Sequence, residues 1–424
     1  MSRIIFGILA FSLILSPMSF AAEDGLSLNE TLRLAYKYNP EMNQARQEIE
    51  ASKGRHIQAE ALPNPEAELS VGGLKAKRQI ADDGSEKVSR RGSLDTFSIK
   101  QPLDPLGTRF LRGRIASDEV KIAQSDLNFL WGGIRKNIVS LYAEILTEEK
   151  AKEIAQSNLT ATRQFFTSVE TKFQSGSSLQ SDVIRANIEV SRAENDFLVS
   201  DKNLKLSKGR MNLSLGRTVD SVFSLSDSLN YEALKYQYQT VLTDAYTNRA
   251  DLLSETTRLS AREKSVQKSI LKTFLPEMSI GVERSTQDFD NDTSLLLQAS
   301  YPLWGFNLGE VKEAQAEKEK QKIRLESLKR EVGLDVYQAF IEAELADKQV
   351  LLQQKALDEA NELLRQISIQ YEGGKIQFLT YLENIKTIKE TRLAYFVALK
   401  EYKEKVAELE RVIQATPIPE GEKS

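Results

Sequence analysis

The sequence predicts a mainly α-helical protein with a small β part, built from a duplicated unit. Three observations lead to this fold class. Only 10 of the 424 residues are proline, and two proline-free stretches, 106–275 and 303–416, permit very long helices. Short segments in which polar and apolar residues alternate predict a few β-strands. The same features follow one another in the same order in both halves of the chain, as expected of an internal repeat.

The first 21 residues predict a secretory signal peptide. Arg3 precedes an apolar run over 4–15, and Ser19-Phe20-Ala21 fits the small-x-small cleavage pattern. The run is too short to cross a bilayer as a helix. We therefore expect residues 1–21 to be removed and the mature chain to be exported.

The repeat is visible as matched motifs in the two halves. Leu62-Pro63 corresponds to Leu275-Pro276, and Pro102-Leu103 to Pro302-Leu303. Further along, Phe173-Gln174-Ser175-Gly176 corresponds to Tyr371-Glu372-Gly373-Gly374. We expect a first structural repeat over 22–229, a second over 230–414, and a flexible tail over 415–424.

Four strands are expected, two in each repeat. Residues 66–71 and 97–100 alternate in polarity in the first repeat, and residues 278–283 and 295–301 do so in the second. The polar inserts between these strands, 73–95 and 284–293, are expected to be hairpin loops. Five apolar positions are expected to share the outer face: Leu69, Val71, Ile99, Ile280 and Leu297.

The remaining residues predict long helices. Segments 108–173 and 308–371 would span about 99 Å and about 96 Å at 1.5 Å per residue. Segments 41–61 and 179–215 are together almost as long as 108–173, so two helices stacked end to end can flank one long helix. Apolar residues at heptad spacing in these segments indicate coiled-coil packing.

Composition excludes several classes of function. There is no cysteine, so the chain has no disulfide, thiolate metal site, cysteine nucleophile or lipidated N-terminal cysteine. Histidine occurs once, at His56, which leaves little room for zinc hydrolysis or a serine triad. A net charge of -4 argues against nucleic-acid binding. We expect no catalytic residue, no cofactor and no metal site, and we interpret His56 as a solvated helical residue.

Four alternating strands leave two open edges, which lipid does not tolerate, and a membrane barrel needs about eight or more strands. Copies of the chain must therefore combine. Three copies would supply twelve strands, with the five apolar positions outward and their polar neighbours inward. Tyr301, Trp304 and Phe306 would form an aromatic girdle at the membrane interface, or would pack against the start of the next helix.

Taken together, the duplicated layout and the segments 62–65 (Leu-Pro-Asn-Pro), 101–109, Phe173-x-x-Gly176 and Tyr371-x-x-Gly374 make the sequence similar to a known family. It resembles the TolC-type outer-membrane efflux proteins of Gram-negative bacteria over essentially the whole mature chain. The resemblance implies a homotrimer with a twelve-stranded outer-membrane barrel continued by a long periplasmic tunnel of helices. Such a tunnel docks onto a periplasmic adaptor (membrane fusion) protein and an inner-membrane transporter.

The resemblance also implies site residues. The glycine turns would form the periplasmic tip, with Gly176, Ser178, Gly374 and Lys375 as adaptor contacts; an ordinary helix-hairpin turn is the alternative. Family members often carry acidic residues after this glycine, which form a ring that narrows the closed channel. The matching positions are Thr380, where an acidic residue is expected, and Glu383, with Asp182 as the first-repeat equivalent of Thr380. A solvated helix face is the alternative for these three residues.

The function expected from these observations is a passive exit duct in the outer membrane, part of a tripartite efflux system and not an enzyme. Its cargo would be metal cations or small toxic compounds and drugs. Segment 101–107 looks more like the heavy-metal cation branch of the family than the multidrug branch. The main alternative is a soluble periplasmic coiled-coil scaffold or adaptor protein, which would share the signal peptide and the heptads.

Overall fold

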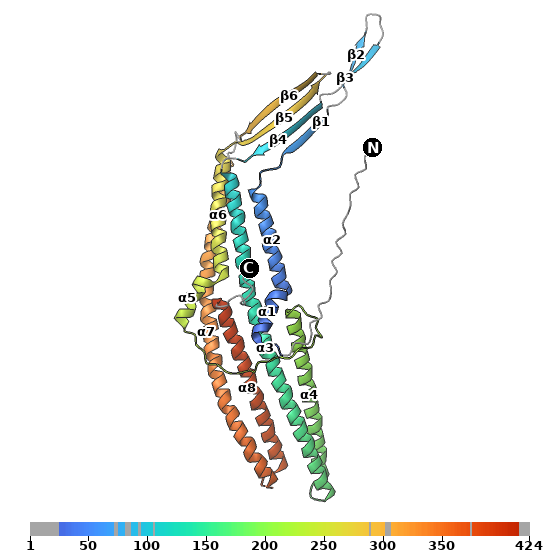
Figure 1. The fold of residues 1–424 in the computed structure, drawn as a ribbon. Helices are drawn as coiled ribbons and strands as arrows, with labels where there is room; N and C mark the ends of the chain where they lie inside the picture. Colours follow the sequence, from blue (N-terminus) through green and yellow to red (C-terminus); the bar gives the residue numbers. More distant parts are fainter. Residues whose placement is uncertain are drawn as a thin grey trace.

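The computed structural model describes residues 25–71, 75–80, 86–91, 95–104, 107–287, 290–301, 307–373 and 375–414. The expected signal peptide, the expected tail over 415–424, and Trp304, Phe306 and Gly374 lie outside these residues. The molecule is elongated, with a β-sheet at one end and two helical hairpins at the other (Figure 1).

Both halves of the chain have the same order of elements: two helices, strands, a very long helix and a shorter helix. The first half consists of α1 (Leu28–Tyr38), α2 (Pro40–Glu60), β1 (Glu66–Val71), β2 (Lys75–Ile80), β3 (Glu86–Arg91), β4 (Asp95–Leu103), α3 (Thr108–Gln174) and α4 (Gln180–Ser214). The second consists of α5 (Tyr238–Asn248), α6 (Ala250–Phe274), β5 (Glu277–Gln287), β6 (Asp290–Ser300), α7 (Leu308–Glu372) and α8 (Phe378–Ile413).

The first helices begin where the side chains before them satisfy free backbone N–H groups. Ser27 and Glu30 form a capping box at α1. Asn39 Oδ1 accepts hydrogen bonds from the N–H groups of Glu41 and Met42 at 2.9 and 3.3 Å, and Pro40 occupies the first position of α2. The Asn-Pro step therefore both ends α1 and starts α2.

The main sheet is antiparallel with the strand order β1-β4-β5-β6. Its register places Leu69 opposite Phe97, Ile99 opposite Val282 and Ile280 opposite Leu297. Directly opposite residues share a face, so these positions form one apolar face. The exposed fractions of Leu69, Ile99, Ile280 and Leu297 are 69%, 47%, 41% and 70%. Val71 pairs with Asp95 at the end of the same row of positions.

The opposite face of the sheet is mostly polar. Glu68, Ser98 and Glu283 are aligned there by the register, and Lys100 Nζ lies 3.2 Å from Glu68 Oε2. The nine residues of β4, at about 3.3 Å each, give about 30 Å, which is the length of a tilted transmembrane strand. The predicted two-faced sheet is confirmed.

The insert 73–95 differs from the expected loop, because it contains the antiparallel pair β2–β3. Strands β5 and β6 likewise continue into the insert 284–293. The described residues therefore contain six strands, four of them in the main sheet. Strands β2 and β3 were not predicted because their sequences, KAKRQI and EKVSRR, are mostly polar and contain too few apolar residues to show an alternation.

The two long helices begin at the predicted residues and run the length of the helical part. Helix α3 has 67 residues and packs against α2 and α6 near the sheet and against α4 and α8 further away. Helix α7 has 65 residues and packs against α6 and then against α8. The helices near the sheet are thus in the order α2-α3-α6-α7, which is the order of the strands that adjoin them (Figure 1).

The largest hydrophobic core lies where α1 and α2 meet the middle of α3 and the end of α4. Trp131 is 2% exposed, and its ring meets that of Tyr36 edge-on at 5.1 Å. A second core joins α5, α7 and the end of α8. Within the described residues, no helix combines the length and hydrophobicity that crossing a bilayer requires.

Candidate functional site

The hairpin of α3 and α4 ends in a turn that only a positive φ angle completes. Gly176 has φ 74°. Its N–H donates to the carbonyl of Phe173 at 2.9 Å, and the N–H of Ser177 donates to the carbonyl of Lys172 at 2.8 Å. This pair of bonds is the Schellman motif, which glycine adopts without the cost that a Cβ adds.

The hairpin of α7 and α8 ends in a corresponding turn. Helix α7 ends at Glu372, and the N–H of Lys375 donates to the carbonyl of Gln370 at 2.8 Å. This bond occupies the place of the Ser177–Lys172 bond in the first repeat. The predicted turns are confirmed, and the two hairpins end in matching tips at the end of the molecule opposite the sheet (Figure 1).

The tips expose both polar and apolar residues. Gly176 and Lys375 are exposed and Ser178 is half-buried. Beside them, Leu179 is 69% exposed and Phe173 is 41% exposed. The sequence interpretation named the glycines and missed these two apolar residues, although large apolar residues that flank an exposed turn are themselves a signal of a contact surface.

Asp182 lies in the first turn of α4, where it has a local structural partner. Its carboxylate accepts hydrogen bonds from Ser178 Oγ at 3.2 Å and from the N–H of Leu179 at 3.4 Å. A carboxylate in this position satisfies free N–H groups and interacts favourably with the helix dipole. Asp182 therefore stabilises the turn, independently of any role in an acidic ring.

The other two gate candidates lie near the start of α8. Thr380 is exposed, and its carbonyl accepts from the Asn384 amide at 2.7 Å. Glu383 is exposed and lines a cleft between α8 and the α3–α4 hairpin, together with Glu189 and Arg192. The described contacts do not join Asp182 to Glu383 within one chain, so a ring formed by these residues stays a prediction.

Contacts between the two hairpins lie just above the tips. The Tyr371 and Tyr381 rings stack with centroids 4.5 Å apart, and the Phe165 ring of α3 lies 5.7 and 6.3 Å from them. Further up, Lys389 of α8 forms an ion pair with Asp196 of α4. These residues were not predicted as a group, because the partners of each pair between hairpins are far apart in sequence.

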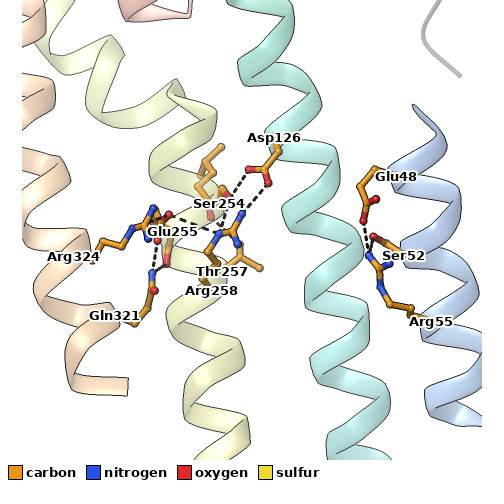
Figure 2. A network of polar contacts seen from close by, with 11 residues as sticks. Glu48, Ser52, Arg55, Asp126, Ser254, Glu255, Thr257, Arg258, Gln321 and Arg324 are labelled. Atoms are coloured by element: carbon orange, nitrogen blue, oxygen red, sulfur yellow. Dashed lines mark hydrogen bonds and ion pairs between the residues drawn. The ribbon is translucent and has the colours of Figure 1, made fainter. Parts of the chain in front are cut away.

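A network of charged residues ties together the helices nearer the sheet (Figure 2). The buried Glu255 carboxylate of α6 lies 3.3 Å from Arg324 Nε of α7 and 3.7 Å from Arg258 Nε, and it accepts from the Gln321 amide. Arg258 also contacts Asp126 of α3 at 2.8 Å. Because burying an unpaired carboxylate is costly, these partners fix the positions of three helices relative to one another.

His56 lies on α2 with its Nε2 3.6 Å from Glu60 Oε1 on the same helix. Across the residues described in the structure, no group of three or more His, Asp or Glu side chains could hold a metal ion. The described residues present a two-faced sheet at one end of the molecule and two exposed tips at the other (Figure 1).

Comparison with known proteins agrees with this architecture. A family model described as outer membrane efflux protein matches residues 31–217 and 241–413. The cobalt-zinc-cadmium resistance protein CzcC of Cupriavidus metallidurans is 19% identical over 392 residues, which cover 92% of this chain and 90% of that protein.

Solved structures share the fold at low sequence identity. The CmeC outer membrane channel of Campylobacter jejuni has a TM-score of 0.78 and 14% identity, with 93% of this chain and 87% of that chain covered. CusC has a TM-score of 0.72 and 15% identity, with 93% and 95% covered. The open state of the MtrE outer membrane channel of Neisseria gonorrhoeae has a TM-score of 0.72 and 16% identity, with 91% and 88% covered. With its family model matched over most of its length, the chain belongs to the outer membrane efflux protein family: it is an outer-membrane efflux channel protein with a periplasmic helical extension, and not an enzyme.

Proposed function

We propose that three copies of the chain form a closed exit duct, and that the duct conducts substrates passively from an inner-membrane transporter and a periplasmic adaptor to the exterior. The proposal extends the family assignment to the assembly, the partners and the cargo of this chain. It requires that the edge helix and edge strand of one copy pack against those of the next copy.

The observation that carries this proposal is a pair of exposed apolar stripes on the two helices at the edges of the lower layer. That layer has the order α4-α3-α8-α7. Helix α7 exposes apolar residues on the side opposite its buried Val332, Val336 and Val350, and α4 does so opposite its buried Ala186, Ala193 and Met211. The exposed residues are Leu334, Ile341, Leu345 and Leu352 on α7, and Ile184, Ile188, Leu206 and Leu213 on α4.

A ring of copies would bring these stripes together. In a closed ring, α7 of one copy lies beside α4 of the next, and β6 of one copy lies beside β1 of the next. Because each copy contributes four antiparallel strands to the main sheet, β6 meets the next β1 in antiparallel orientation, and closure leaves no open edge. Apolar stripes of this length are unfavourable in water and indicate a protein interface.

A double substitution at the stripes tests the assembly. Leu206→Glu with Leu345→Glu places charges in the proposed interface, whereas Thr387→Glu adds a charge on α8, which is not an edge helix. We expect the wild type and Thr387→Glu to migrate as heat-sensitive trimers in detergent and to conduct ions in planar bilayers. The double variant is expected to migrate as a monomer without conductance, and a trimer that conducts normally would refute the proposed interface.

For the cargo, we propose metal cations, as in the heavy-metal branch that segment 101–107 resembles. The support is the similarity to a cobalt-zinc-cadmium resistance protein. Deletion of the gene should lower tolerance to cobalt, zinc or cadmium more than tolerance to organic drugs. Drug sensitivity with unchanged metal tolerance would overturn the metal assignment and leave the duct itself intact.

For the partners, we propose that the exposed tips bind the adaptor. The tips are the described residues farthest from the sheet, so in the periplasm they face the inner membrane. Replacing Leu179 by Ser should weaken crosslinking of the trimer to its adaptor without changing the trimer band. The same substitution at Leu253, an exposed apolar residue far from the tips, serves as the control. Equal crosslinking for both variants would contradict adaptor docking at the tip.

A further inference from the structure

The four helices next to the sheet expose large apolar side chains where they adjoin it. Ile57 of α2, Phe110 of α3, Phe274 of α6 and Leu308 of α7 are 61% to 71% exposed, and Ile270, one turn from Phe274, is also exposed. Each lies within four residues of the helix end that adjoins the sheet. We call these five residues the apolar collar. Exposed apolar residues at one level of four helices indicate a contact surface.

On α3, Phe110 lies on a face that no other helix covers. Toward α2, a Cβ at Gly113 would lie 3.0 Å from the Glu60 side chain. Toward α6, Asp118 forms an ion pair with Lys264. With 3.6 residues per turn, Phe110 projects between these two sides. The next copy in a ring would meet α2 or α7, so it would leave Phe110 exposed.

Phe274 and Ile270 lie on the same face of the helix layer as Phe110. On α6, Lys264 faces α3 and Glu255 faces α7, as their ion pairs show. Ile270 and Phe274 project between these two sides. Since α6 runs toward the sheet and α3 away from it, successive residues rotate in opposite senses, and this places the three apolar residues on one face of the layer.

The other open face of α3 is charged. Arg112 pairs with Asp104 at 3.0 Å, and Glu119 lies 4.0 Å from Arg55. The sheet has the same division into a polar and an apolar face. A water-filled duct favours polar side chains on its inner surface, so the face with the apolar collar is the outer one and continues the apolar face of the sheet.

Two arginines accompany Phe110 in a groove between α2 and α3. The Arg114 guanidinium lies 4.8 Å from the centre of the Phe110 ring, and among the residues that the structure describes no carboxylate forms an ion pair with it. Arg109 Nε donates to the carbonyl of Glu60 at 2.7 Å. The only carboxylate among the described residues of the groove is that of Glu60, 3.6 Å from His56 Nε2, so the two guanidinium groups outnumber it.

The depth of these groups matches the headgroup region of a membrane. The headgroups add about 5–8 Å on each side of the hydrocarbon core. Phe110 is the third residue of α3, and Arg114 lies one turn, about 6 Å, further from the sheet. With the sheet in the hydrocarbon core, Phe110 lies at its boundary and Arg114 among the phosphate groups, which is the order that interfacial aromatic and arginine side chains adopt.

We propose that the apolar collar lies in the periplasmic leaflet of the outer membrane, and that Arg109 and Arg114 bind the phosphate groups of its phospholipids. The apolar side chains then contact the acyl chains next to the headgroups. The proposal rests on the closed duct proposed above, because a ring of copies defines which face of the helix layer is the outer one.

Spin labels test the depth, because a chain without cysteine needs only one introduced thiol. Phe110→Cys and the control Leu253→Cys are labelled and placed in liposomes of phosphatidylethanolamine and phosphatidylglycerol. Leu253 is an exposed apolar residue of α6, about 30 Å further from the sheet. We expect the ratio of collision rates with oxygen and with a water-soluble nickel chelate to be several-fold higher at position 110. Equal ratios at the two positions would overturn the proposal, and a collar that faces the lumen would give this result.

Lipid binding tests the arginines. Native mass spectrometry measures the affinity of the purified trimer in detergent for phosphatidylglycerol, with diacylglycerol of the same acyl chains as the comparison. One cation near an anionic surface contributes about fivefold in affinity, so Arg114→Gln should lose about fivefold, whereas Arg114→Lys keeps the charge and should retain most of the affinity. The control Lys121→Gln removes a cation about 10 Å further along α3 and should lose little.

Equal losses for Arg114→Gln and Lys121→Gln would overturn phosphate binding at the collar, as would complete competition by inorganic phosphate at the same phosphate concentration, which would mean a general anion site. The heat-sensitive trimer band and bilayer conductance report on the duct separately. If the wild type forms no trimer, the closed duct fails, whereas a conducting trimer with a water-exposed position 110 refutes the collar alone. If Phe110→Cys does not assemble, Phe274→Cys on α6 provides the same measurement.

Discussion

Loss of the contacts between the two hairpins should make the tips separate more easily. The perturbation is Tyr381→Ala together with Lys389→Ala. The ring of Tyr381 contacts that of Phe165 in the other hairpin, and such a contact contributes about 0.5–1.5 kcal/mol. The ion pair of Lys389 with Asp196 adds at most about 1 kcal/mol, because the two side chains are 22% and 44% exposed. A total of about 1–2 kcal/mol corresponds to about a 5- to 30-fold shift between joined and separated hairpins.

Single-channel recording of the purified protein in planar bilayers measures this shift. We expect the double variant to spend more time in high-conductance states than the wild type. The control is Lys386→Ala, which removes an exposed lysine one turn from Lys389 whose own ion pair, with Glu390 at 3.9 Å, lies within α8. If the double variant assembles as a trimer and its conductance equals that of the wild type and the control, these contacts do not hold the tips together.

Three further predictions concern stability and pH. Trp131→Ala should destabilise the fold by about 3–5 kcal/mol because the ring is buried in the main core, and denaturant unfolding measures the loss. Gly216→Ala should lower the melting temperature, because Gly216 has φ 68° and a Cβ there would lie 2.6 Å from the carbonyl oxygen of Tyr38; an unchanged melting temperature would contradict this geometry. Burial raises the pKa of Glu148 and of Glu404 above the usual 4.5, so the folded chain binds more protons than the unfolded chain just above that pH. Stability should therefore fall as pH rises through this window, and replacing both residues by Gln should flatten the pH dependence of thermal unfolding.

Much of the fold could be predicted because local signals mark its boundaries. The start of α3 at Thr108 follows a proline and a glycine, and its end precedes Gly176, which supplies the positive φ of the turn. The alternation of β1 and of residues 278–283 in β5 showed which residues share the apolar face. Each of these features is determined by residues that are close together in the sequence, so the sequence alone is enough to predict it.

The other features of the fold and of the candidate site depend on contacts between residues that are far apart in sequence or in different copies of the chain, and a local pattern does not show these contacts. The polar strands β2 and β3 pair through the backbone, and their composition alone resembles that of a loop. Phe165 meets Tyr371 and Tyr381 only after two hairpins of the tertiary fold lie side by side. Asp182 fits both a charged ring and a helix cap by sequence, and the hydrogen bonds from Ser178 and Leu179 establish the cap, whereas the ring depends on other copies of the chain.

The continuity of α3 through the middle of the molecule has a mechanical consequence. Tyr142 is anchored there by hydrogen bonds to the carbonyl of Leu26 at 2.9 Å and to Asp227 at 3.0 Å. From Tyr142 to the end of α3 at Gln174 is a little over 30 residues, or about 50 Å of helix. If the helix pivots at the anchor by about 10°, its end moves about 8 Å, given this length of helix. A small rotation about the well-packed middle of α3 thus gives a large displacement of the hairpin tip, while the core around Trp131 changes little.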